Sequence, residues 1–157
     1  MKKIIIKIMK KVKDYICPPA TQDLKLNTKN RDATIKQYNY GPLNVDEPGD
    51  YWKDIAKYWK TSEKAAMKSN CGNCVAFDIS PRMKECLPGD TFDKDGQLGY
   101  CWMHHFKCHS ARACNTWAGS EPIKSNKTSA EWQQKNMPGL KESKVKKIKK
   151  VHLKIED

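Results

Sequence analysis

The clearest hydrophobic period of the chain runs from residue 51 to residue 69. Its apolar members recur at i, i+3, i+4 and i+7 and are Trp52, Ile55, Ala56 and Trp59. This spacing marks one face of a helix, and lysines and carboxylates occupy the positions between. Asp50 follows the turn dipeptide Pro48-Gly49 and is a candidate N-cap. The pattern predicts a helix whose tryptophans cover the cysteine-rich segment that begins at Cys71.

The two ends of the chain show a weaker apolar stripe among many lysines. Residues 1–13 carry six lysines and no acidic residue, and residues 141–157 carry seven lysines and three acidic residues. We therefore expect a basic amphipathic arm over residues 1–19 and a basic tail over residues 140–157. The apolar run at residues 4–6 is interrupted at once by Lys7. A signal peptide or a transmembrane span needs a longer apolar run, so neither is expected. We therefore expect a cytoplasmic location.

The remaining segments carry less information. Residues 20–50 show no sustained period and contain Gly41-Pro42 and Pro48-Gly49, so an extended connector is expected there. Residues 101–114 predict a short helix that brings two cysteines and two histidines to one side. Ser129 is expected to cap another short helix that contains Trp132. Residues 51–139 would then form a single domain of one long helix and a cysteine-rich metal core.

Composition limits the size of the core. The chain has 157 residues, a hydrophobic content of 38% and a mean hydropathy of −0.83. A length of this order fits one domain, and so polar a chain gains from a metal or a covalent cross-link. The sequence therefore predicts a small irregular α+β fold, with a loop-rich metal-stabilised core, one clear helix and flexible basic termini.

The net charge of +12 belongs mostly to the ends. Residues 71–119 contain five basic and five acidic side chains, so the cysteine-rich segment is neutral. The lysine-rich termini predict contact with nucleic acid or with another anionic surface.

Six of the seven cysteines fall between residues 71 and 114, together with three histidines. Disulfides, zinc and an iron–sulfur cluster could each explain this density. Disulfides are the least expected, because they need an oxidising compartment and no secretory signal is seen. Zinc fits the Cys71-x2-Cys74 pair, which can reach one ion around a tight turn. A second pair of zinc ligands would then come from Cys101, Cys108, Cys114, His104, His105 or His109.

An iron–sulfur cluster needs four thiolates that converge from separate turns in a place with little water. The four cysteines with this distribution are Cys71, Cys74, Cys86 and Cys101. Aromatic residues flank them, and the glycines between them allow close approach of the backbone.

The segments "CGNCVAF", "CLPG" and "LGYC" resemble the cluster-binding segment of the high-potential iron–sulfur proteins. The resemblance covers about residues 70–102. It implies a 4Fe-4S cluster ligated by Cys71, Cys74, Cys86 and Cys101, one-electron transfer to a redox protein partner, and no catalysis. Cys108 and Cys114 are surplus to this pattern. Cys114, which has an aromatic residue three positions later, is a rival for the fourth ligand.

The flanking sequence also resembles small cysteine-rich proteins of marine bacteriophages. This resemblance carries no function, but it adds the host cytoplasm or the virion to the expected locations. Two alternatives to the electron carrier stay open. One is a zinc-stabilised binding module whose tails contact nucleic acid or an acidic partner. The other is a metal-stapled structural component of a viral assembly.

Overall fold

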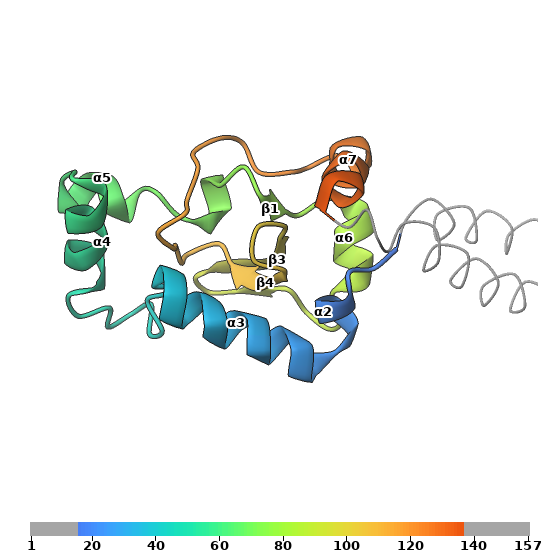
Figure 1. The fold of residues 1–157 in the computed structure, drawn as a ribbon, viewed down its shortest axis with the longest axis horizontal. Helices are drawn as coiled ribbons and strands as arrows, with labels where there is room; N and C mark the ends of the chain where they lie inside the picture. The colour runs from blue at the N-terminus through green and yellow to red at the C-terminus, as the bar shows by residue number, and fades with distance from the viewer. Residues whose placement is uncertain (1–15, 137–157) are drawn as a thin grey trace, which may run out of the picture.

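A computed structural model describes residues 16–136 of the chain (Figure 1). Most of the basic arm and the whole basic tail therefore lie outside the described residues. The helices are α2 (Pro19–Gln22), α3 (Leu24–Tyr38), α4 (Tyr51–Trp59), α5 (Glu63–Met67), the 3-10 turn η1 (Cys71–Asn73), α6 (Pro81–Cys86) and α7 (Asn126–Asn136). The strands are β1 (Phe77–Asp78), β2 (Phe92–Asp93), β3 (Gly96–Cys101) and β4 (Phe106–His109). The expected mixture of helices and a small sheet is confirmed.

The sheet is antiparallel and is organised around β3. Strand β4 pairs with β3 so that Cys101 faces Phe106 and Gly99 faces Cys108. Strands β1 and β2 pair with β3 over its second and first halves. Because side chains alternate along a strand, β3 sends Tyr100 to one face of the sheet and Cys101 to the other. The central strand thus contributes to two separate clusters of buried side chains.

The expected helix over residues 51–69 is present but is divided into two pieces. Trp52, Ile55 and Ala56 are buried, as the apolar period predicts. Lys60 then adopts a left-handed conformation with φ of 57°, which ends α4, and the side chain of Ser62 caps α5. Helices α4 and α5 pack against each other at one end of the molecule (Figure 1).

Helix α3 replaces the extended conformation expected for its part of residues 20–50. The side chain of Asp23 accepts a hydrogen bond from the amide of Leu26 and caps the helix. Two amide side chains bind α3 to the segment after β3: the Asn27 side chain accepts from the amide of Lys107, and the Asn30 side chain donates to the carbonyl of His105. Leu26, Ile35 and Tyr38 also pack against the buried clusters. These three side chains are too few and too widely spaced to form a sustained apolar period, so the hydrophobic pattern does not predict this helix.

The prediction of a short helix over residues 101–114 is also wrong. This segment leaves β3, turns through residues 102–105 and returns as β4. His105 has φ of 57° in this turn, and its amide donates to the carbonyl of Cys101. The return strand pairs with the strand before it, and this pairing satisfies the backbone groups that a helix would have satisfied internally.

A buried carboxylate holds the side chains together on the face of the sheet that contains Tyr100 and Trp102. Asp78 is fully buried, and its Oδ2 accepts hydrogen bonds from Trp102 Nε1 at 2.9 Å and from the hydroxyl of Ser129 on α7. Its Oδ1 accepts from the amide of Ser80 at 2.9 Å. Ser129 therefore lies inside α7 and anchors this helix to the sheet; the expected N-cap role falls instead to Ser125, which accepts from the amide of Thr128.

Within residues 16–136, no helix has both the length and the apolar character needed to cross a bilayer.

Candidate functional site

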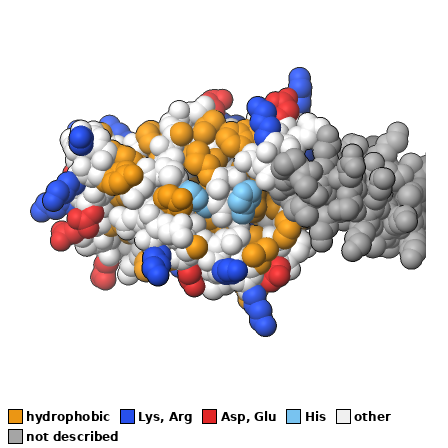
Figure 2. Space-filling model, viewed as in Figure 1, with side chains coloured by type: hydrophobic (Ala, Val, Ile, Leu, Met, Phe, Trp, Pro, Cys, Tyr) orange, Lys and Arg blue, Asp and Glu red, His pale blue; other side chains and the backbone are white. Residues whose placement is uncertain are grey.

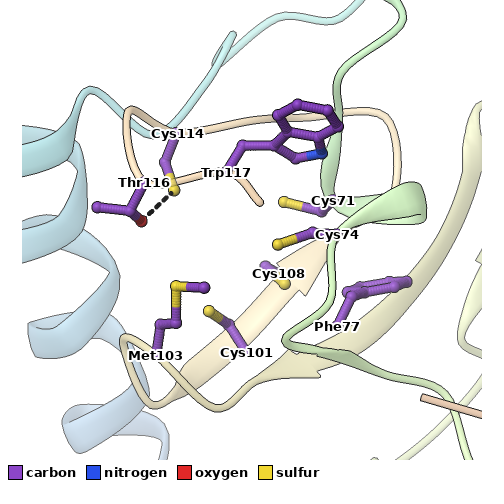
Figure 3. Close-up of a pocket in the computed structure, with 9 residues that line it drawn as sticks. All are labelled: Cys71, Cys74, Phe77, Cys101, Met103, Cys108, Cys114, Thr116 and Trp117. Carbon is purple, nitrogen blue, oxygen red and sulfur yellow. Dashed lines mark hydrogen bonds between the residues drawn. The ribbon is translucent and has the colours of Figure 1, made fainter. Parts of the chain in front are cut away.

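Five cysteines surround one cavity of about 20 Å³ beside the sheet (Figure 3). They are Cys71, Cys74, Cys101, Cys108 and Cys114, and none of them forms a disulfide. Phe77, Met103, Thr116 and Trp117 complete the wall. The donors offered to this cavity are therefore sulfur atoms in an apolar surrounding, which suit the soft metals zinc, copper(I) and iron in iron–sulfur clusters.

The five thiols come from four separate segments of the chain. Cys71 opens η1, and Cys74 follows directly after it. Cys101 ends β3 and Cys108 lies in β4, so the sheet register places them on the same face as diagonal neighbours. Cys114 comes from the loop after β4. Figure 3 shows their sulfur atoms directed toward the space between these segments.

The wall of the cavity depends on close packing at Gly99. A Cβ atom at this position would lie 2.6 Å from the ring of Phe77 and 2.9 Å from the carbonyl oxygen of Asp78. Glycine is therefore the residue that lets Phe77 cross β3 and reach the cavity.

The exposure of the whole residue separates one cysteine from the other four. The residues Cys71 and Cys74 are 8% exposed and Cys101 and Cys114 are 9% exposed, whereas Cys108 is only 1% exposed. Four cysteines thus have a similar small exposure, and Cys108 is enclosed more deeply by the protein.

Backbone amides approach the sulfurs of three of the five cysteines, which are Cys74, Cys101 and Cys114. The sulfur of Cys74 accepts hydrogen bonds from the amides of Ala76 and Ala118. The sulfur of Cys101 accepts from the amides of Met103 and His104. N–H donors of this kind stabilise thiolates and metal-bound sulfur.

Cys114 has donors of its own. The amide of Thr116 donates to its sulfur, and the hydroxyl of Thr116 lies 3.2 Å from the same atom. Burial nevertheless raises the pKa of Cys114 to about 12. Burial likewise raises the pKa of Cys74, against the opposing effect of its two amide donors.

Cys108 lies beside the sulfurs of Cys101 and Cys71. Burial raises its pKa, and its contacts with these two sulfurs raise it further. The hydrogen bond with Cys108 is in turn the largest cause that lowers the pKa of Cys101, although burial opposes it. The contact between the two sulfurs therefore lowers the pKa of Cys101 and raises that of Cys108.

Cys86 does not belong to this cluster. The structure joins it to Cys17 in a disulfide with a Cα–Cα distance of 5.4 Å, on the side of the sheet that holds Tyr100 and Trp102. Of the four ligands expected from the sequence, Cys71, Cys74 and Cys101 come together and Cys86 lies elsewhere. Disulfides were the least expected of the three cysteine chemistries, so the disulfide between Cys17 and Cys86 departs from that expectation.

The three histidines expected as alternative ligands have other partners. The Nε2 of His104 lies 2.6 Å from the Thr116 hydroxyl, and its ring stacks on Tyr38. The Nδ1 of His105 lies 3.3 Å from the Tyr100 hydroxyl, and the Nε2 of His109 lies 2.9 Å from an oxygen of Asp93. None of the three rings lines the cavity, so the donor set is made of cysteines.

Trp117 covers the cavity in place of the tryptophans of α4. Its Nε1 donates to the carbonyl of Asn70 and to the side-chain oxygen of Asn73, both at 2.9 Å, which fixes the indole over the cysteine turn. Trp59 packs behind it with a ring distance of 5.6 Å, whereas Trp52 packs among α4, α5 and Ala113. The expectation that the tryptophans of α4 cover the site therefore holds only indirectly, through Trp59.

Two lining residues escaped the sequence analysis. Met103 and Thr116 each follow a cysteine by two positions, and that spacing is the only signal in the sequence that could have indicated them. As the side chains stand, no group of three or more His, Cys, Asp or Glu residues within residues 16–136 is arranged to hold a metal ion.

Comparisons with known proteins do not add a family to these observations. No protein-family model matches the chain, and neither the curated proteins nor the solved structures give a match. The resemblance to high-potential iron–sulfur proteins stays a prediction, and the candidate site of this chain rests on its own five cysteines.

Proposed function

We propose that this protein is a one-electron carrier that holds a 4Fe-4S cluster through Cys71, Cys74, Cys101 and Cys114. The carrying observation is the set of backbone N–H donors directed at the sulfurs of Cys74, Cys101 and Cys114 around one apolar cavity. Cys114 takes the place that the sequence analysis gave to Cys86. Cys108, which is more deeply buried than the other four cysteines, is left out of the ligand set.

The chemistry of the donors fits this group. A cubane cluster is bound by four cysteine thiolates from separate loops, and hydrogen bonds to sulfur together with low solvent exposure set its potential. The cavity of about 20 Å³ has room for roughly one water molecule. A four-iron cluster is larger, so loading requires the thiol side chains to turn outward.

The residues of the chain have three roles in this proposal. The four cysteines would bind the cluster. The amides of Ala76, Ala118, Met103, His104 and Thr116 stabilise negative charge on the sulfurs. Phe77 and Trp117 exclude water from the cavity. When bound, the cluster supplies reversible one-electron transfer.

A series of single Cys→Ser variants tests the ligand set. Full-length protein is prepared without oxygen, and iron, sulfide and visible absorption are measured for each variant. We expect four irons per chain in the parent protein and loss of iron and colour in the variants at Cys71, Cys74, Cys101 and Cys114. The variant at Cys108 should keep its iron. The variant at Cys86 breaks the disulfide with Cys17, so it should keep as much iron as Cys17→Ser, which breaks the same bridge. Loss of iron in Cys86→Ser together with retention in Cys114→Ser would reverse the assignment.

The size of the cavity favours one second candidate. A single zinc ion needs less space than a cubane and uses the same kind of thiolate donors. The protein would then be a metal-stabilised binding module, with its lysine-rich termini contacting nucleic acid or an acidic partner. Colourless protein that contains one zinc per chain and no iron would establish this candidate and refute the electron carrier.

A further inference from the structure

Two indole rings connect the cysteine cavity to one end of the molecule. Trp117 lines the cavity, and the ring of Trp59 lies 5.6 Å from it at an interplanar angle of 45°. Each ring is held by its own nitrogen: Trp59 Nε1 donates to the carbonyl of Asn115 at 2.9 Å, and Trp117 Nε1 donates to two acceptors around η1. The rings are therefore fixed relative to each other and to the thiols.

This connection ends at the α4–α5 surface, which we define as the exposed side chains of residues 53–68. Trp59 is the last residue of α4 and is half-buried. Beside it in sequence, Tyr58 is 62% exposed, and Met67 on the adjoining α5 is 52% exposed. Large apolar side chains are thus presented to solvent on α4, which carries Trp59, and on the adjoining α5.

The α4–α5 surface is also basic. Its exposed lysines are Lys53, Lys57, Lys60, Lys64 and Lys68, and its carboxylates are Asp54 and Glu63. Within residues 16–136, none of these lysines forms an ion pair. Figure 2 shows lysine side chains at the end of the molecule that α4 and α5 form, with apolar and acidic side chains among them.

This mixture favours a protein as the occupant. Tyrosine and methionine are enriched in the cores of protein–protein interfaces, and a charged rim gives complementarity and faster encounter. A nucleic-acid site would gain from an unbroken row of positive charge along the phosphate backbone, which Asp54 and Glu63 interrupt. The unpaired lysines specify that the partner surface is acidic.

We propose that the α4–α5 surface docks an acidic one-electron redox protein and that Trp59 and Trp117 form the path between this partner and the cysteine cavity. The inference rests on the proposed function as an electron carrier. One electron passes in each encounter. The carrier loses this electron and the acidic partner gains it, and no bond is made or broken. The reverse direction uses the same surface.

The test uses two small one-electron oxidants in place of the partner. Ferricyanide is anionic, and the tris-phenanthroline complex of cobalt(III) is cationic. The variant Lys57→Glu/Lys64→Glu alters the α4–α5 surface, and Lys25→Glu/Lys29→Glu makes the same charge change at exposed positions in the first half of α3. Stopped-flow oxidation rates of the reduced full-length proteins are compared at low and high salt.

We expect the α4–α5 variant to be oxidised by ferricyanide about fivefold more slowly than the α3 control at low salt. The cationic complex should show the opposite order, and high salt should remove both differences. Trp59→Leu should slow both oxidants with iron content and reduction potential unchanged, and Trp59→Phe, which keeps an aromatic ring, should recover part of the rate.

The outcomes distinguish a failure of the electron-carrier function from a failure of the docking surface alone. Iron is measured on every preparation; its absence from the parent protein would refute the electron carrier and this surface with it. Full iron content with equal rates in the two charge variants, or with no effect of Trp59→Leu, would overturn the docking surface alone. Binding to a short DNA duplex that is lost in the α4–α5 variant and kept in the α3 variant would assign the surface to nucleic acid and also overturn the proposal.

Discussion

Replacing Cys17 by serine should destabilise the protein strongly and leave its metal content unchanged. The disulfide between Cys17 and Cys86 joins residues that are 69 positions apart. In the chain-entropy treatment, closing a loop of this length removes enough freedom from the unfolded chain to stabilise the fold by about 4 kcal/mol. The bridge also fixes α2 against α6, and the cysteines at its two ends pack in the cluster around Tyr100 and Trp102.

The measurement is urea unfolding of Cys17→Ser and Cys86→Ser beside the parent protein, with the thiol count and iron content determined on each. Either variant breaks the same bridge, so both should lose about 4 kcal/mol of unfolding free energy. Equal iron content in both variants is the second expectation, because Cys86 lies outside the cysteine cavity. The reasoning is refuted if Cys86→Ser alone loses iron, or if neither variant alters the unfolding free energy.

Three further predictions concern single residues in or beside the buried clusters. Asp78→Ala leaves Trp102 Nε1 and two further buried donors without an acceptor, so urea unfolding should show a loss of about 3 kcal/mol, and exposed Asp90→Ala is its control. Gly99→Ala forces a Cβ into the ring of Phe77 and should cost about 1–3 kcal/mol, measured in the same way; an unchanged midpoint would contradict the packing at β3. Burial lowers the pKa of His104, so its contribution to stability is present above pH 6.5 and is lost as the pH falls through the lowered pKa; thermal unfolding of His104→Gln should therefore lose part of its pH dependence below about pH 6.5.

How well the sequence predicts a helix depends on what the helix packs against. Helix α4 buries Trp52, Ile55 and Ala56 at helical intervals, and the interval alone is enough to predict it. Helix α3 is longer but is joined to the sheet by Asn27 and Asn30, whose hydrogen bonds leave no trace in a hydrophobic pattern. The helix expected over residues 101–114 failed because the pairing of β4 with β3 depends on a turn at His105.

The cysteines also differ in how far the sequence predicts their positions. Cys71 and Cys74 are close in sequence, so their spacing alone indicates that both can reach one point. Cys101, Cys108 and Cys114 reach the same point only because the sheet folds the chain back on itself. The bridge between Cys17 and Cys86 spans most of the described chain, and no local pattern indicates which distant cysteine is its partner.

The alternation of side chains along β3 has a consequence for how the chain tolerates change. A slip of one residue in the pairing of this strand would turn every side chain to the opposite face. Tyr100 would then fill the space among the thiols, and Cys101 would meet the carboxylate of Asp78. The hydrogen bond from Trp102 to Asp78 opposes such a slip, since the indole reaches this acceptor in one register only. The carboxylate of Asp78, on the far side of the sheet, thus fixes the register that the sulfur site requires. We expect insertions or deletions between Gly96 and Trp102 to disrupt that site.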